Sequence, residues 1–94
     1  MHGEYKMPGG KLVVADLEVR NGKLTRVRIS GDFFLEPDSA LTLIDVALEG
    51  VAVDAGNKHH AEVLEAALGP SVRMYGVSTE AIAVAVQRAL ESPA

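Results

Sequence analysis

The stretch KLVVADLEVRNGKLTRVRISG, residues 11–31, decides the fold because its pattern is typical of two half-buried β-strands joined by a turn. In residues 12–20 apolar and polar side chains alternate, so that one face is aliphatic. That face consists of Val13, Ala15, Leu17 and Val19. Residues 23–31 alternate in the same way, with Thr25, Val27 and Ile29 on one side and Arg26, Arg28 and Ser30 on the other. The stretch therefore predicts an antiparallel pair with an aliphatic face and a basic face.

Asn21-Gly22 lies between these strands, where a two-residue hairpin turn is the usual interpretation. Such a turn would pair Leu17 with Arg26 and bring arginines among the apolar side chains, because paired residues share a face. A loop one residue longer pairs Leu17 with Thr25 and gives every inward residue an acceptable neighbour. We therefore predict a three-residue loop with a bulge, in which Gly22 takes the left-handed position.

Working outward, residues Gly3–Met7 predict a third strand, turned back onto the second by Pro8-Gly9-Gly10. The rest of the chain predicts three helices, and Arg73–Val77 is a candidate short strand. The whole is expected to be a single α+β domain over residues 1–94. Strands within about 3–34 form a three-stranded antiparallel sheet, and helices within about 37–91 cover one of its faces.

Each helix is predicted from its start and stop residues and from its apolar stripe. The first helix begins at Pro37 and ends at Gly50. Asn57 caps the second helix, which ends at Gly69-Pro70, and Ser78 or Thr79 caps the third. The expected inward residues of the first helix are Ala40, Leu41, Ile44, Ala47 and Leu48. Those of the second are Ala61, Leu64, Ala67 and Leu68, and those of the third are Ile82, Ala85, Val86, Ala89 and Leu90.

Composition is ordinary for a globular domain, with 48% hydrophobic and 23% charged residues in 94. No cysteine is present, which excludes disulfides and cysteine-based zinc sites. No apolar run approaches the roughly 20 residues that span a membrane, and the N-terminus lacks an apolar signal segment. We therefore expect a cytoplasmic protein.

Charge is unevenly distributed. Residues 1–31 hold six of the nine basic residues and three of the thirteen acids, although the net charge of the chain is −4. This balance favours either an anion or acidic partner for the first third, or a solvated sheet face beside acidic helices. A pI near 5.2 and the lack of an aromatic platform argue against a nucleic-acid binder.

No complete catalytic centre is recognisable in the sequence. His59 and His60 are adjacent and would face different sides of a helix, while His59 and Glu62 are more typical of a surface turn than of a metal site. His2 is expected to be mobile near the terminus. The signatures of metalloproteases, serine hydrolases and phosphate-binding loops are missing.

Two short segments remain as candidate binding sites. In Met7-Pro8-Gly9-Gly10-Lys11, two glycines before a lysine would present backbone N–H groups beside a cation, which suits phosphate or carboxylate, although a plain turn is the alternative. In the second segment, Gly31-Asp32-Phe33-Phe34, strand parity directs Phe33 to the core and Phe34 outward if the strand runs on past Gly31, whereas a bulge at Gly31 would swap the two. Phe34 is then a candidate anchor for a partner, the alternative being that both rings cover the core.

GEYKMPGGKLV (3–13), ISGDFF (29–34) and ALTLIDVALEG (40–50), in this order and separation, resemble the C-terminal accessory domain of lipoate–protein ligases. In that family a large catalytic domain binds lipoate and ATP, forms lipoyl-AMP and passes the lipoyl group to an acceptor lysine. The small α+β domain packs near the active site and supports adenylation. In some organisms the two parts are separate polypeptides. A 94-residue chain that holds only the small part resembles that split arrangement.

The resemblance implies an accessory, non-catalytic subunit that forms a heterodimer with a catalytic subunit. ATP, Mg²⁺ and lipoate would bind the catalytic subunit, with no cofactor held by this chain alone, and lipoyl acceptor domains are further candidate partners. Gly9, Gly10 and Lys11 would form the turn that faces the active site. Gly31, Asp32, Phe33 and Phe34 would lie near the subunit interface. The alternative is a free-standing adaptor that binds a protein through its helices, without nucleotide chemistry.

Overall fold

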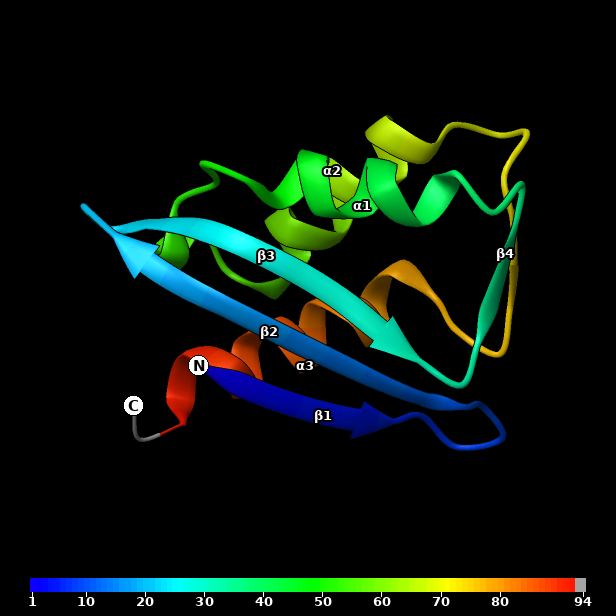
Figure 1. Cartoon of the computed structure of the whole chain (residues 1–94), viewed down its shortest axis with the longest axis horizontal. Coiled ribbons are helices and arrows are strands. Elements are labelled where there is room, and N and C mark those ends of the chain that lie inside the picture. The colour runs from blue at the N-terminus through cyan, green and yellow to red at the C-terminus, as the bar shows by residue number, and fades with distance from the viewer. Residues whose placement is uncertain (93–94) are drawn as a thin grey trace.

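The computed structural model describes residues 1–92 and confirms the α+β fold (Figure 1). Three strands form an antiparallel meander: β1 (His2–Lys6), β2 (Leu12–Arg20) and β3 (Lys23–Gly31). A second, two-stranded sheet pairs β4 (Phe34–Glu36) with β5 (Arg73–Tyr75). The helices are α1 (Ala40–Leu48), α2 (Asn57–Leu68) and α3 (Thr79–Glu91), with a short 3₁₀ turn, η1 (Val53–Ala55). Within residues 1–92, no helix has the length and apolar character needed to cross a membrane.

The core lies between the meander and the helices. Helix α3 packs against β1 and β2, α1 packs against β3, and α2 packs against both other helices (Figure 1). The largest fully buried aliphatic side chains of the core are Leu24, Ile29, Ile44, Leu48, Leu64, Ile82, Val13 and Val86. Burial of each contributes about 1.5–3 kcal/mol relative to exposure, so the aliphatic stripes of the sequence hold the fold together.

The hairpin prediction was wrong in its loop length. Asn21 and Gly22 form a two-residue turn that pairs Arg20 with Lys23, and both turn residues have positive φ, of 53° and 74°. This is the geometry that matches the twist of the flanking strands. Val19, expected to face inward, is 40% exposed near this turn.

A bulge further along β3 removes the difficulty that had argued against the short turn. Glu18 pairs with Thr25 and Asp16 with Arg28, so two residues of β3, Arg26 and Val27, lie opposite one residue of β2. Arg26 takes a left-handed φ of 50° and is exposed. The extra residue reverses the strand's parity, which allows both Leu24 and Val27 to be buried while the arginines stay outside.

The helix boundaries differ from the predictions at two starts. Helix α1 begins at Ala40 rather than Pro37, because residues 37–39 form a turn after β4. Asn57 is the first residue of α2, whose cap position is Gly56, so the expected Asn57 cap was wrong. Ser78 caps α3 as predicted, since its hydroxyl oxygen accepts from the Ala81 N–H at 3.1 Å.

The predicted apolar stripes are otherwise confirmed, except at four residues. Ala67 is exposed, and Leu41, Ala47 and Leu90 are partly buried against the core. The candidate strand Arg73–Val77 forms β5, which ends at Tyr75.

Helix α1 also covers the β3 edge of the sheet. The Asp45 carboxylate accepts the Ile29 N–H at 3.0 Å, and the Glu49 carboxylate accepts the Val27 N–H at 2.7 Å. Because β3 is an edge strand, these N–H groups point away from β2 and would otherwise offer a template for another strand. The acidic face of α1 therefore protects the edge.

Candidate functional site

The turn between β1 and β2 is a tight turn around Pro8 and Gly9. The Gly10 N–H donates to the Met7 carbonyl at 2.9 Å, and Gly9 has a φ of +74°. Proline followed by a residue with positive φ is the signature of a type II turn, which explains why glycine stands second. Gly9, Gly10 and Lys11 thus lie at the tip of the meander.

The backbone of this turn does not form the open cradle that the sequence suggested. The Gly10 N–H is used within the turn, and the Lys11 N–H donates to the Gly76 carbonyl at 2.8 Å. An anion would therefore meet the exposed Lys11 side chain rather than these two N–H groups. The aliphatic stem of Lys11 packs on Gly76. A Cβ added to Gly76 would lie only 2.5 Å from Lys11 Cγ.

The exit of β3 lies beside the same turn. Gly31 pairs with Val13, and the Asp32 N–H donates to the Leu12 carbonyl at 3.0 Å. A Cβ on Gly31 would come within 2.1 Å of the Leu12 oxygen, and its φ is +150°. Glycine is required here because the chain passes the Leu12 backbone too closely for a side chain.

Both predicted segments therefore meet at one end of the molecule, together with residues 75–76, where β5 ends (Figure 1). We call residues 7–11, 31–34 and 75–76 the turn end. Sequence reasoning missed Tyr75 and Gly76, for which the only signal was a candidate short strand.

The two phenylalanines divide as expected, although not by strand parity. Strand β3 ends at Gly31, so the premise that the strand runs on was wrong. Phe33 is partly buried and packs against the core, whereas Phe34 is 58% exposed in β4. A hollow of about 180 Å³ lies beside them, lined by Phe33, Phe34, Leu35, Asp38 and Leu41. The exposed ring and this hollow give the turn end an apolar surface.

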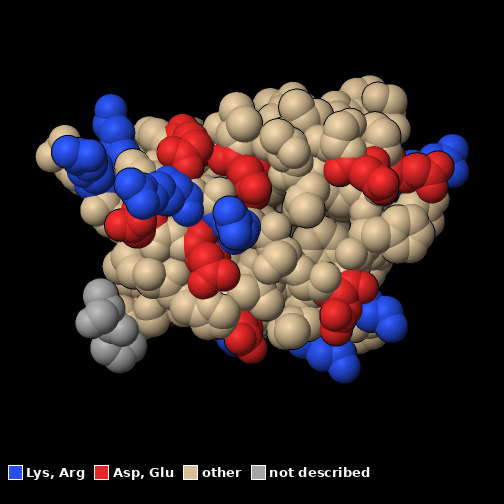
Figure 2. Space-filling model, viewed as in Figure 1, with Lys and Arg blue, Asp and Glu red and all other residues tan. Residues whose placement is uncertain are grey.

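The basic face of the sheet is mixed in charge. Lys and Arg gather where the β2–β3 turn lies, interleaved with carboxylates (Figure 2). Arg26 Nε lies 3.5 Å from the Glu18 carboxylate, and Arg28 lies near enough to Asp45 to affect its pKa. Of the two charge interpretations, the structure favours a solvated sheet face.

The histidines are placed differently from expectation. His2 is held in β1, where its ring nitrogens lie 2.7 Å from the Asp16 and Glu4 carboxylates, so the expected mobility was wrong. His60 is fully buried, and its Nε2–H donates to the Ala52 carbonyl at 3.1 Å. Within residues 1–92, no three histidine or acidic side chains are grouped as metal ligands.

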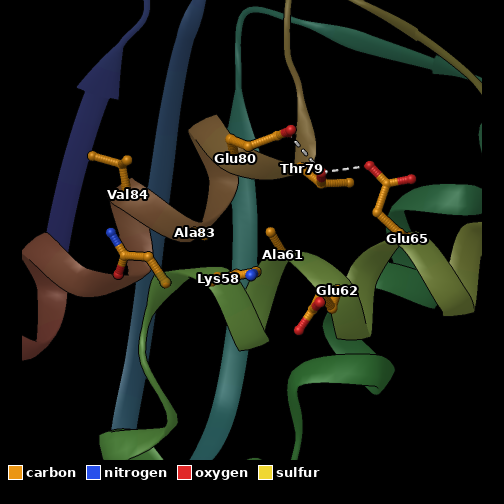
Figure 3. A pocket seen from close by; sticks show the side chains of 9 residues that line it. Lys58, Ala61, Glu62, Glu65, Thr79, Glu80, Ala83 and Val84 are labelled. Carbon is orange, nitrogen blue, oxygen red and sulfur yellow. Dashed lines mark hydrogen bonds between the residues drawn. The ribbon is translucent and has the colours of Figure 1, made fainter.

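A groove between α2 and α3 was missed by sequence reasoning (Figure 3). Its volume is about 350 Å³, and Thr79, at the start of α3, lies in its wall. The Thr79 hydroxyl is 2.8 Å from a carboxylate oxygen of Glu65 and 2.8 Å from one of Glu80. Thr79 had been considered only as a helix cap, and no motif marks the two glutamates.

Comparisons with known proteins give one informative match. No family model and no curated protein matches the sequence. The fold matches a chain of a solved archaeal lipoylation system. That structure, from Thermoplasma acidophilum, is described as a bipartite lipoate protein ligase and its E2 lipoyl domain. The match has a TM-score of 0.70 and 21% identity, and covers 92% of this chain and 97% of the other. The two chains therefore share their fold over nearly their whole lengths.

Proposed function

We propose that this chain is the accessory, non-catalytic subunit of a two-component lipoate–protein ligase. The observation that carries the proposal is the structural match, over nearly the whole chain, to a chain of a lipoylation system whose ligase is bipartite. The motifs at 3–13, 29–34 and 40–50, which resemble the accessory domain of these ligases, support the same assignment. The subunit would pack on a separate catalytic subunit and support ATP-dependent formation of lipoyl-AMP.

The turn end is the surface that we assign to the catalytic subunit. Phe34 offers an exposed ring beside an apolar hollow, which suits the centre of a protein interface. The exposed Lys11 ammonium would approach the site where the catalytic subunit holds ATP, Mg²⁺ and lipoate. A fixed positive charge there stabilises the negative charge that develops as pyrophosphate leaves, particularly where water is excluded.

The test is formation of lipoyl-AMP by the catalytic subunit encoded in the same genome, measured with and without this chain. We expect adenylation to depend on the chain. Lys11→Ala should slow adenylation about tenfold, which corresponds to about 1.4 kcal/mol of transition-state stabilisation, and Lys11→Arg should restore most of the rate. Lys23→Ala is the matched control, because Lys23 begins β3 beside the β2–β3 turn, at the opposite end of the sheet from Lys11, and it should leave the rate unchanged. Equal lipoyl-AMP formation with and without the chain would refute the proposal.

The same assay separates two other functions. A free-standing adaptor would bind a protein through its helices while Lys11→Ala changed neither binding nor adenylation. If the chain were instead the lipoyl acceptor, its own intact mass would rise by one lipoyl group during the reaction. For an accessory subunit we expect its mass to stay unchanged while a separate acceptor domain is modified.

A further inference from the structure

The groove between α2 and α3 combines an apolar floor with an acidic rim. Ala61 of α2 and Ala83 and Val84 of α3 line its floor. Glu62 and Glu65 lie on the α2 side and Glu80 on the α3 side, and all three are exposed. The small floor side chains leave room for an incoming chain, so that an apolar stem could lie on the floor while a charged group reached the rim.

Two rim carboxylates, of Glu65 and Glu80, share the single hydroxyl of Thr79. Glu65 and Glu80 reach the Thr79 hydroxyl from different helices, each at an O–O distance of 2.8 Å (Figure 3). A hydroxyl group has a single proton, so only one of these carboxylates can accept it. The other carboxylate then lies 2.8 Å from the hydroxyl oxygen with no proton between the two atoms. Thr79 itself is only 3% exposed. An N–H donor between the two carboxylates would satisfy both.

The rim also carries unbalanced negative charge. Lys58 is the single cation among the lining residues, against the three glutamates. The ion pairs found within residues 1–92 involve Glu4, Asp16 and Glu18, and none of the groove's acids. Charge complementarity therefore favours a cationic occupant.

From this geometry we propose that the α2–α3 groove docks a partner protein through an arginine side chain flanked by apolar residues. Arginine fits because its planar guanidinium presents several N–H donors and can bridge two carboxylates. Its aliphatic stem and the flanking apolar residues would cover Ala61, Ala83 and Val84. A lysine would supply the charge but not the planar fork.

The groove lies close to the turn end but does not depend on its assignment. Glu80 and Val84 also line the adjacent hollow of about 200 Å³ that contains Met7 and Pro8. One partner could therefore contact both surfaces. The proposal requires no nucleotide chemistry, and its test leaves Lys11 and Phe34 unaltered, so it can fail while the ligase assignment stands.

The experiment titrates the full ¹⁵N-labelled chain with an acetylated, amidated pentapeptide whose central arginine is flanked by leucines. The matched probe replaces the arginine by citrulline, which has the same shape without the charge. We expect saturable amide shifts confined to the groove residues of α2 and α3, with binding weakened at least about fivefold by citrulline. Binding should also weaken as sodium chloride is raised.

Variants of the chain then locate the binding charge. Glu65→Gln combined with Glu80→Gln should reduce the affinity for the arginine peptide about tenfold, whereas Glu91→Gln, on α3 outside the groove, should not change it. Melting followed by circular dichroism confirms that each variant is folded; if the double variant unfolds, the arginine–citrulline comparison decides. Equal shifts with both peptides, shifts elsewhere on the chain, or the same groove shifts with Mg²⁺ alone would overturn the proposal.

Discussion

The rings of Phe34 and Tyr75 stack with their centroids 4.7 Å apart and an angle of 15° between their planes. The two residues pair directly across β4 and β5, and both remain exposed, at 58% and 39%. Stacking holds the Phe34 ring in one orientation on the surface, which lowers the entropic cost of ordering the ring when a partner binds. Such a ring is preorganised for binding.

Phe34→Ala should separate the stability of the domain from its association. Because the ring is largely exposed, we expect the free energy of unfolding in urea to fall by only about 0.5–1 kcal/mol, the usual contribution of a cross-strand aromatic pair. Affinity for the proposed catalytic subunit, measured by calorimetry, should fall at least about tenfold if Phe34 anchors the proposed interface. Val46→Ala, at a 64% exposed position on α1, is the control. Unchanged affinity for Phe34→Ala would remove this residue from the interface.

Gly31→Ala should disrupt the turn end by overlap of backbone atoms. The new methyl group would lie 2.1 Å from the Leu12 oxygen, and neither strand can move without breaking the β2–β3 pairing. We expect a loss of at least about 2 kcal/mol in the free energy of unfolding. Gly9→Ala has open space around its Cβ and only an unfavourable φ, so it should cost about 1 kcal/mol. If urea melts gave the two variants the same loss in free energy of unfolding, the close approach to the Leu12 oxygen would contribute nothing to the cost of Gly31→Ala.

The meander was predictable because its aliphatic alternation fixes which face is buried, as Val13, Ala15 and Ile29 show. The position of the extra residue was not predictable. Keeping arginines out of the core requires one unpaired residue, and the sequence pointed to the Asn21-Gly22 turn, where glycine accepts a left-handed φ. The structure places it at Arg26, whose side chain gives no sign that its φ is 50°.

The candidate site was predictable only in pieces. Lys11 and Phe34 stood out from the local sequence, but their neighbours Gly76 and Tyr75 are brought to them by β5, which is distant in the chain. Thr79 and Glu65 likewise lie on different helices. Contacts between remote elements depend on the packing of the whole core, and a single sequence carries no direct signal for them.

Asp45→Asn should stabilise the protein near neutral pH. Burial raises the pKa of Asp45 above its usual value of 3.8, while the Ile29 N–H and the nearby Arg28 oppose that rise. The folded state thus binds the Asp45 proton more tightly than the unfolded state does. The contribution of Asp45 to the free energy of unfolding therefore falls as pH rises from 3.8 through the raised pKa. Asparagine keeps an oxygen that can accept the Ile29 N–H without the buried charge.

Urea melts at several pH values check the Asp45 prediction. The stability advantage of Asp45→Asn should be present at pH 7 and vanish as the pH falls below about 3.8. Asp38→Asn, which changes an exposed carboxylate before α1, should show no such advantage. Destabilisation of Asp45→Asn at pH 7 would mean that the charged hydrogen bond to Ile29 outweighs the cost of burial.

His2 should make the sheet more stable at mildly acidic pH. Its two ring nitrogens contact two carboxylates, of Glu4 and Asp16, and only the imidazolium can donate to both. These hydrogen bonds raise the pKa of His2 above 6.5. The contribution is therefore fully present below pH 6.5 and is lost as pH rises through the raised native pKa.

An NMR titration of the His2 ring proton tests this, with the signal assigned from its absence in His2→Gln. We expect a pKa above 6.5 in the native chain, and a lower pKa in Glu4→Gln, because Glu4 is the largest cause of the shift. Wild type should exceed His2→Gln in stability below pH 6.5 and match it once the ring is neutral. A native pKa at or below 6.5 would show that the His2 ring is solvated rather than held between the two carboxylates.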